Sequence, residues 1–201
     1  MIRFVCCAAL GYLLGSLSAA ILISKYLFGQ DVRLSGSGNA GATNAARVFG
    51  LGVGFMTFAF DFCKCLAALL LGRHIAGAGG LAAGGIACLL GHCFPVFFRF
   101  RGGKAVSCGA AVAVIVSGWL ALAAAAVFLL TARLFRRASV SSMSAAVAMA
   151  ALSPLFTREA PVLVLTVFTA SLVVFMHRSN IRRLLSGTEP EFHPGKSPRR
   201  K

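Results

Sequence analysis

Long apolar segments alternate with short polar ones along most of the chain. The apolar runs cover residues 4–28, 48–72, 75–98, 105–132, 138–156 and 160–176. A helix rises about 1.5 Å per residue, so about 20 residues cross the hydrocarbon core of a bilayer. The pattern therefore predicts an all-α integral membrane protein.

The first run resembles a signal peptide only superficially. It continues past residue 20 to Lys25, which is longer than the apolar core of a typical signal. We therefore expect an uncleaved first span. Gly11 and Gly15 lie one helical turn apart in it and predict close contact with another helix.

The run at 105–132 is long for one crossing and short for two. A single crossing would separate the basic cluster at 133–137 from the cluster at 99–104, whereas Lys and Arg tend to stay on the cytoplasmic side. Two short helices that meet near Ser117 and Gly118 keep both clusters together. We therefore expect seven transmembrane helices, two of them short, with the N-terminus outside and the C-terminus in the cytoplasm.

Three polar segments emerge on the cytoplasmic face in this topology. They read SGSGNAGATNAAR (35–47), GHCFPVFFRFRGGK (91–104) and HRSNIRRLLSGTE (177–189). Glycines in the first segment allow backbone N–H groups to converge on an anion, and Arg47 can pair with a phosphate. The first segment therefore predicts a phosphate-binding loop at a membrane surface.

The other two polar segments carry matching chemistry. Gly102 and Gly103 can expose N–H groups beside the cationic Lys104. His177 and Asn180 lie three residues apart on a helix, so both side chains can face one site. The three segments together are suited to phosphorylated substrates.

Gly36, Gly38 and Gly41 also match the dinucleotide-binding pattern G-x-G-x-x-G, but their surroundings do not. That pattern needs a buried strand before it and a βαβ unit around it. Residues 31–34 instead form a charged loop, and apolar helices flank both sides. We therefore interpret these glycines as a general anion-binding loop beside a helix start.

Several polar residues are also explained by structural roles. Asp61 and Lys64, within the second run, suit either an internal ion pair or a place in the site. Glu189 stands among cations and suits an ion pair that orders its loop. The serines at 139–144 can cap the following helix or reach the site. His92 suits packing against backbone.

Composition narrows the function further. The chain is 58% hydrophobic with mean hydropathy +0.85, and 20 Lys and Arg against 5 Asp and Glu give a net charge of +15. This charge suits anionic substrates and membrane lipids, and no nucleic-acid motif accompanies it. Five acids are too few for a carboxylate metal cage, and the cysteines lie in apolar runs, so we expect no metal, cofactor or disulfide framework. We expect one transmembrane domain over 1–189 and a basic tail without fixed structure at 190–201.

The three segments resemble the bacterial acyl-phosphate:glycerol-3-phosphate acyltransferases of the PlsY type. The shared patterns are Gly36-Ser37-x-Asn39-x-Gly41-Ala42-Thr43-Asn44-x-x-Arg47, Gly91-His92-x-Phe94-Pro95-x-Phe97 with Phe100-x-Gly102-Gly103-Lys104, and His177-Arg178-x-Asn180-Ile181-x-Arg183-Leu184 with Gly187-x-Glu189. The resemblance covers nearly the whole chain. Arg101 stands where the family usually has lysine and Ala105 where it usually has glycine, which matters because alanine adopts positive φ poorly.

The resemblance implies transfer of a fatty acyl group from acyl-phosphate to the 1-hydroxyl of glycerol 3-phosphate, giving lysophosphatidate and phosphate, with no acyl-CoA or acyl-carrier-protein donor. It also implies a place in the bacterial cytoplasmic membrane with the active site on the cytoplasmic face, and it is compatible with functional coupling to the enzyme that makes acyl-phosphate. None of the four histidines is followed five residues later by Asp, the pattern on which other glycerolipid acyltransferases rely.

The resemblance and the residue chemistry together assign roles. We expect catalytic roles for Ser37, Arg47, Lys104, His177 and Asn180. Substrate binding is expected of Gly36, Asn39, Gly41, Thr43, Asn44, His92, Arg101, Gly102, Gly103 and Ser144, and structural roles of Asp61, Lys64 and Glu189. Lys104 and the Gly102–Gly103 backbone would hold the acyl-phosphate, and His177 or a substrate phosphate would accept the hydroxyl proton.

Two other functions fit the sequence less well. A transporter of a phosphorylated solute is the alternative, but the chain shows no internal repeat and its polar segments face one side. A metal-dependent phospholipid synthase would need more aspartates than the two present.

Overall fold

The structure, a computed structural model, describes residues 1–191, and the regular elements in this part are all helical. The α-helices are α1 (Ile2–Gly15), α2 (Ala19–Phe28), α3 (Ala42–Phe49), α4 (Leu51–Cys93), α5 (Val106–Val116), α6 (Gly118–Phe135), α7 (Ala138–Leu152), α8 (Ala160–Met176) and α9 (Arg178–Leu185). Short 3-10 helices lie at η1 (Val32–Leu34), η2 (Val96–Phe98) and η3 (Ser153–Leu155). The predicted all-α fold is confirmed. The tail predicted at 190–201 lies outside the described residues from residue 192 onward.

The first apolar run is broken between α1 and α2, at residues 16–18. In the low-dielectric interior of such a fold, a backbone carbonyl without a partner is costly. Lys64 of α4 donates a hydrogen bond to the carbonyl of Leu17, inside this break. The second apolar run therefore stabilises the point at which the first one bends.

The long helix α4 folds back on itself. Its backbone leaves the helical conformation at Ala76 and Gly77, and Gly77 has a φ of 60°, a left-handed value that suits glycine. The two arms then pack closely, since a Cβ on Gly72 would lie 2.3 Å from the carbonyl oxygen of Gly80. The second and third predicted runs are thus the two arms of one hairpin, and α3 precedes them as a separate short helix.

The break predicted near Ser117 and Gly118 is confirmed. α5 ends at Val116 and α6 begins at Gly118, and the Ser117 hydroxyl accepts a hydrogen bond from the Trp119 amide at 3.2 Å. Only α5, with 11 residues, is short, because α6 continues for 18 residues to Phe135. The expectation of two short helices was therefore wrong for α6.

By length and apolar composition, four helical segments within residues 1–191 could cross a bilayer. They are Ile2–Phe28, Leu51–Phe98, Gly118–Phe135 and Ala138–Leu155. α8 and α9 form a fifth candidate if they are counted together, although the chain bends by 53° between them. Several crossings are therefore available, while the count of seven and the orientation of the termini stay predictions.

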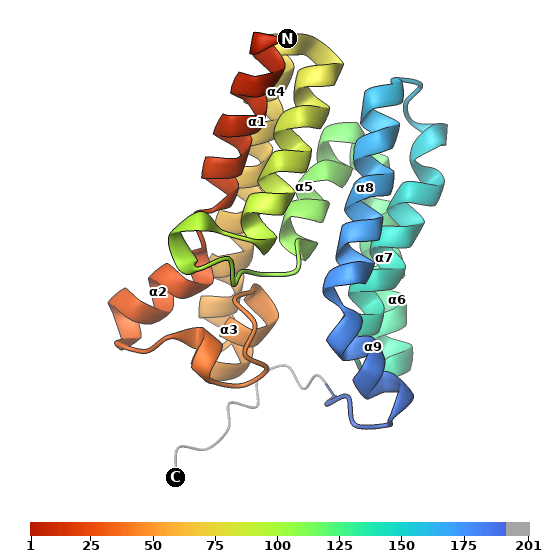
Figure 1. The fold of residues 1–201 in the computed structure, drawn as a ribbon. Coiled ribbons are helices and arrows are strands. Elements are labelled where there is room, and N and C mark those ends of the chain that lie inside the picture. The colour runs from red at the N-terminus through yellow and green to blue at the C-terminus, as the bar shows by residue number, and fades with distance from the viewer. Residues whose placement is uncertain (192–201) are drawn as a thin grey trace.

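Glycines hold α1 against α4, as the spacing of Gly11 and Gly15 predicted. A Cβ on either residue would lie 2.2 Å from a carbonyl oxygen of α4, on Gly84 and Cys88 respectively. Figure 1 shows α2, α3 and α9 at the end of the molecule opposite the N-terminus. The first and third polar segments therefore meet at one end of the bundle.

Candidate functional site

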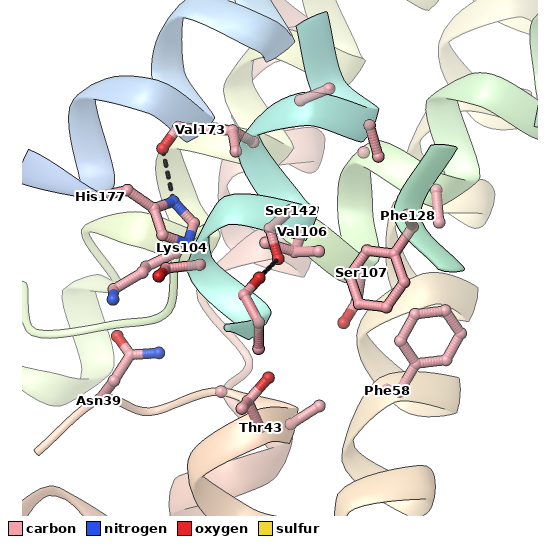
Figure 2. A pocket seen from close by; sticks show the side chains of 18 of the residues that line it. Asn39, Thr43, Phe58, Lys104, Val106, Ser107, Phe128, Ser142, Val173 and His177 are labelled. Carbon is pink, nitrogen blue, oxygen red and sulfur yellow. Dashed lines mark hydrogen bonds between the residues drawn. The ribbon is translucent and has the colours of Figure 1, made fainter. Parts of the chain in front are cut away.

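A cavity of about 470 Å³ lies where the polar segments meet the membrane helices (Figure 2). Twelve of the residues that the sequence assigned to the site or its support line it: Ser37, Asn39, Gly41, Thr43, Asn44, Arg47, Asp61, His92, Lys104, His177, Asn180 and Glu189. All five expected catalytic residues are among them. Segments far apart in the sequence therefore line one cavity.

Lys104 lies just before α5, in the part of the cavity that the polar segments line, which we call the polar end. Its ammonium group donates a hydrogen bond to Oδ1 of Asn180, so the second and third polar segments are joined directly. Burial, followed by the nearby charge of Arg183, lowers the pKa of Lys104 to about 8. The lysine remains mostly cationic at neutral pH and is held in place for an anion.

The amide of Asn180 is in turn held by Glu189. Asn180 Nδ2, Ser139 Oγ and Arg183 Nε donate to the Glu189 carboxylate at 2.6, 2.7 and 2.8 Å. Burial raises the pKa of Glu189, but these three hydrogen bonds outweigh it and hold the pKa below its usual value. The structural role predicted for Glu189 agrees with these contacts, because it links α7 and α9 and orients Asn180 toward Lys104.

His177 occupies the bend between α8 and α9 and is buried. Its Nδ1 lies 2.8 Å from the Val173 carbonyl, drawn as a dashed line in Figure 2, so Nδ1–H is the donor. Nε2 then carries the lone pair of the ring. Burial is the main reason that the pKa of His177 falls to about 4, so the imidazole is neutral at pH 7.

The 35–47 loop is organised around Asn44, which is 1% exposed. Its Oδ1 accepts from the Ser37 amide at 2.8 Å, and its Nδ2 lies 3.0 Å from the carbonyl oxygens of Val32, Ser35 and Asn39. The side chain is thus committed to the loop itself. These contacts support a role for Asn44 in shaping the loop, while the substrate contact that the sequence predicts for it stays a prediction.

Gly36 helps to shape the same 35–47 loop. It has a φ of 63°, and a Cβ there would lie 2.2 Å from Oδ1 of Asn44. Gly36 does not line the cavity. In the described part of the chain, the side chains of Ser37, Asn39, Thr43 and Arg47 form no hydrogen bond or ion pair. These four side chains are therefore the ones in the loop that are available to a ligand.

Gly102 and Gly103 were expected to offer their N–H groups to a phosphate. The structure gives these groups other partners, because the two amides donate to the carbonyls of Cys93 and His92 at 3.1 and 3.0 Å. A Cβ on Gly102 would lie 2.0 Å from the His92 carbonyl oxygen, and one on Gly103 would lie 2.2 Å from Nε2 of His92. The pair therefore serves close packing behind Lys104 and does not line the cavity.

Ala105, which departs from the expected glycine, has a φ of 59°. The loop thus takes a left-handed turn into α5 in spite of the strain that a Cβ adds there. Alanine at position 105 therefore keeps a positive φ, the conformation that glycine adopts more readily.

Asp61, Lys64 and His92 form a buried ionic cluster next to the loop that carries Gly103. Asp61 Oδ1 lies 2.7 Å from Lys64 Nζ and 3.5 Å from His92 Nδ1, and Lys64 Nζ lies 3.1 Å from that same nitrogen. The internal Asp61–Lys64 pair is therefore confirmed. His92, expected to bind substrate, lines the cavity but directs Nδ1 to the ion pair and its carbonyl to Gly103.

Two other expected residues lie away from the cavity. Arg101 is exposed, and Ser144 is not part of the lining, which Ser139 and Ser142 enter instead. Because successive helical residues turn by about 100°, Ser144 points well away from the face that Ser142 and Ser139 share. The sequence alone could have indicated Ser139 and Ser142, because the rotation of about 100° per residue puts these two on one face of α7.

A second hollow of about 270 Å³ adjoins the polar end. It shares Ser37, Asn39, Lys104 and Arg183 with the main cavity and adds the exposed Arg178 and Arg182. Among residues 1–191, no acidic side chain lines it. Anions are therefore attracted to this entrance from the surface of α9.

The opposite part of the main cavity is apolar. Alanines of α5, α6 and α7 make most of its wall, and Phe58 of α4 and Phe128 of α6, both labelled in Figure 2, also line it. We call this part the groove. Within residues 1–191, no group of three or more His, Cys, Asp and Glu side chains is arranged to hold a metal ion.

Comparison with known proteins relates this arrangement to one family. The glycerol-3-phosphate acyltransferase family model matches residues 5–187. A glycerol-3-phosphate acyltransferase of Geotalea daltonii is 43% identical over 182 residues, 90% of this chain and 93% of that protein. One of Thermoanaerobacter sp. (strain X514) is 39% identical over 182 residues, covering 90% of this chain and 92% of that protein.

Two solved structures have the same fold. They are crystal structures of PlsY, an integral membrane glycerol 3-phosphate acyltransferase, in its glycerol 3-phosphate and lysophosphatidic acid forms. The first is 35% identical with a TM-score of 0.89, covering 94% of this chain and 96% of that chain. The second is 34% identical with a TM-score of 0.87, covering 94% and 95%.

Proposed function

The chain belongs to the glycerol-3-phosphate acyltransferase family, and on this premise we propose that it transfers a fatty acyl group from an acyl-phosphate to the 1-hydroxyl of glycerol 3-phosphate. The products are lysophosphatidate and inorganic phosphate. The solved PlsY structures with glycerol 3-phosphate and lysophosphatidic acid support the acceptor and the product. The family match also argues against a transporter.

One observation carries the choice of donor. The cavity joins a basic polar end, with Arg47 and Lys104, to an alanine-lined groove among membrane helices. An acyl-phosphate has the same two parts, a phosphate group and an alkyl chain, joined at the reacting carbon. A donor bound this way places its acyl carbon at the boundary, near Lys104 and Ser139.

The first requirement of the reaction is to bring two phosphorylated substrates together. Their mutual repulsion grows as water leaves the site, so nearby cations have to offset it. Lys104, Arg47 and Arg183 all line the polar end, and the second hollow adds Arg178 and Arg182. These cations stabilise the ground state and the negative charge that develops during transfer.

The bonds then change in one addition and one elimination. The 1-hydroxyl oxygen attacks the acyl carbon, the bond from that carbon to the phosphate oxygen breaks, and phosphate leaves. With a pKa of about 4, His177 is a weak base but a good hydrogen-bond acceptor at Nε2. A phosphate group with a second pKa of roughly 6 is the stronger proton acceptor. We therefore assign alignment of the hydroxyl to His177 and receipt of its proton to phosphate.

The same proposal includes topology. We place a single transmembrane domain over 1–189 in the bacterial cytoplasmic membrane, with seven crossings, the N-terminus outside and the active site on the cytoplasmic face. The gathering of cations at the end that holds α9 supports this orientation. A site that opens to the cytoplasm would also receive acyl-phosphate from the enzyme that makes it.

The test is direct assay of the purified protein with an acyl-phosphate and glycerol 3-phosphate, without added metal. We expect equal amounts of phosphate and lysophosphatidate. Lys104→Met should abolish transfer, whereas Lys25→Met, an exposed lysine on α2, should leave it nearly unchanged. Lysophosphatidate formed from acyl-CoA but not from acyl-phosphate would refute the donor. Uptake of glycerol 3-phosphate into vesicles without acyl transfer would favour the transporter.

A further inference from the structure

The cavity lining follows three helices. It extends from Val106 to Ala113 on α5, from Leu129 back to Ala121 on α6, and from Ala138 to Met149 on α7. These stretches advance about 10.5, 12 and 16.5 Å along their helices. The groove is therefore an elongated channel parallel to the helices.

One end of this channel is polar and fixed. Ser139 of α7 donates to Glu189, which holds Asn180, which in turn accepts from Lys104. The reacting carbon of an acyl-phosphate has to lie at this end. The alkyl chain then extends along the groove parallel to α7, away from Ser139.

The other end of the channel is closed by protein. Met149 and Ala113 are each 2% exposed, and α5 stops at Val116, where the chain turns into α6 at Ser117. The wall at this depth is otherwise alanine, with Ala113, Ala121 and Ala124 lining it. Met149 is thus the long side chain at the closed end.

We propose that Met149 forms the floor of the groove and sets the longest acyl chain that the protein accommodates in extended form. This inference rests on the proposed function, because it concerns the alkyl part of the donor. From Ser139 to Met149, α7 rises about 15 Å over ten residues. An extended alkyl chain advances about 1.25 Å per carbon, given C–C bonds of about 1.5 Å in a zigzag. About 12 carbons therefore reach from the polar end to Met149.

The floor predicts how the rate depends on chain length. Each methylene that enters the groove should raise kcat/KM about fourfold, the value for burial of one methylene. The rise should stop when the chain reaches Met149, because further carbons must bend or leave the groove. Met149→Ala removes three heavy atoms from the floor, so it should move this break by two to three carbons.

The experiment measures saturated acyl-phosphates of 8 to 18 carbons, two at a time, in competition for glycerol 3-phosphate. Competition gives ratios of kcat/KM that do not depend on the amount of active enzyme. Between donors two carbons apart beyond the wild-type break, Met149→Ala should raise the ratio in favour of the longer chain about sixteenfold, from about fourfold for each methylene. Met143→Ala, on α7 but outside the lining, is the matched control and should leave the ratio unchanged.

A second variant tests the same floor from the other direction. Ala146 lines the groove one turn before Met149, and Ala151 on the same helix is exposed. Ala146→Leu should shift the break toward shorter donors by two to three carbons, and Ala151→Leu should not. This variant keeps the inference testable if Met149→Ala does not fold.

The possible outcomes separate the two proposals. An active Met149→Ala or Ala146→Leu with the wild-type break overturns the assignment of the floor and leaves the proposed function intact. Failure of the wild-type protein to use an acyl-phosphate of any length overturns the proposed function, and the floor with it. Shifts in opposite directions in the two variants support both.

Discussion

Replacing Asn44 with Asp tests whether this residue shapes the 35–47 loop or binds substrate. The change keeps the size of the side chain and the acceptor for the Ser37 amide. It replaces an amide nitrogen, 3.0 Å from three carbonyl oxygens, with a carboxyl oxygen. That nitrogen has two hydrogens, so two hydrogen bonds are lost.

The cost follows from the burial of the site, since Asn44 is 1% exposed. Two lost hydrogen bonds contribute about 1 to 1.5 kcal/mol each, and carbonyls left unpaired add about 1 to 3 kcal/mol. We therefore expect the local stability of the loop to fall by about 3 to 6 kcal/mol. Ser37 and Arg47 would then be held less firmly, so KM for phosphorylated substrates should rise and kcat should fall.

Hydrogen exchange over residues 31–49, together with steady-state kinetics, measures the two effects. Asn39→Asp is the matched control because it adds the same charge, lines the same cavity and has no side-chain hydrogen bond within the described chain. It should raise KM in a salt-dependent way without faster exchange. Activity lost in Asn44→Asp with wild-type exchange would refute the loop-shaping role and restore a direct contact with substrate.

Three further predictions use the same assay. Burial lowers the pKa of Lys104 to about 8, so the lysine loses its charge as the pH rises through that value, and kcat/KM should fall above pH 8. Lys104→Arg should retain partial activity without this fall. An identical fall in both proteins would contradict the assignment. His177, with a pKa of about 4, is already neutral above pH 5, so His177→Ala should lower kcat/KM by a similar factor at pH 6 and pH 8; a factor that changes with pH would indicate a titrating base. Gly103→Ala places a Cβ 2.2 Å from Nε2 of His92 and should reduce activity more than a hundredfold. Gly118→Ala, which has open space around the new Cβ, should keep activity near that of the wild type. A fully active Gly103→Ala would show that the loop packing is not needed.

Much of the fold could be predicted because it depends on local patterns. Apolar run lengths indicated the membrane helices, and the distribution of basic residues indicated the break at Ser117. Gly11 and Gly15 indicated a close helix contact, which α4 provides. The bend between α1 and α2 was missed, since it depends on Lys64 reaching the Leu17 carbonyl from another run.

The site was predictable as a set of residues but less so as a set of roles. The sequence placed Lys104 on the same face as His177 and Asn180 through topology, and related the latter two by their spacing; all three line the cavity. It assigned Gly102 and Gly103 to a phosphate, although their amides bind the carbonyls of Cys93 and His92. A glycine pattern permits both roles, and only the position of a neighbouring helix end distinguishes them.

Hydrophobic length, charge distribution and motif order are local properties of the chain, so they alone indicate a helical membrane protein with three polar segments suited to phosphates. Which polar groups are free depends on the folded arrangement. Asn44 and the Gly102–Gly103 amides are occupied within the protein, while Ser37, Asn39, Thr43 and Arg47 face the cavity without a protein partner in the described part of the chain. The depth of the groove and its end at Met149 also depend on the packing of α5, α6 and α7, since a helix face becomes a wall only when its neighbours are in place.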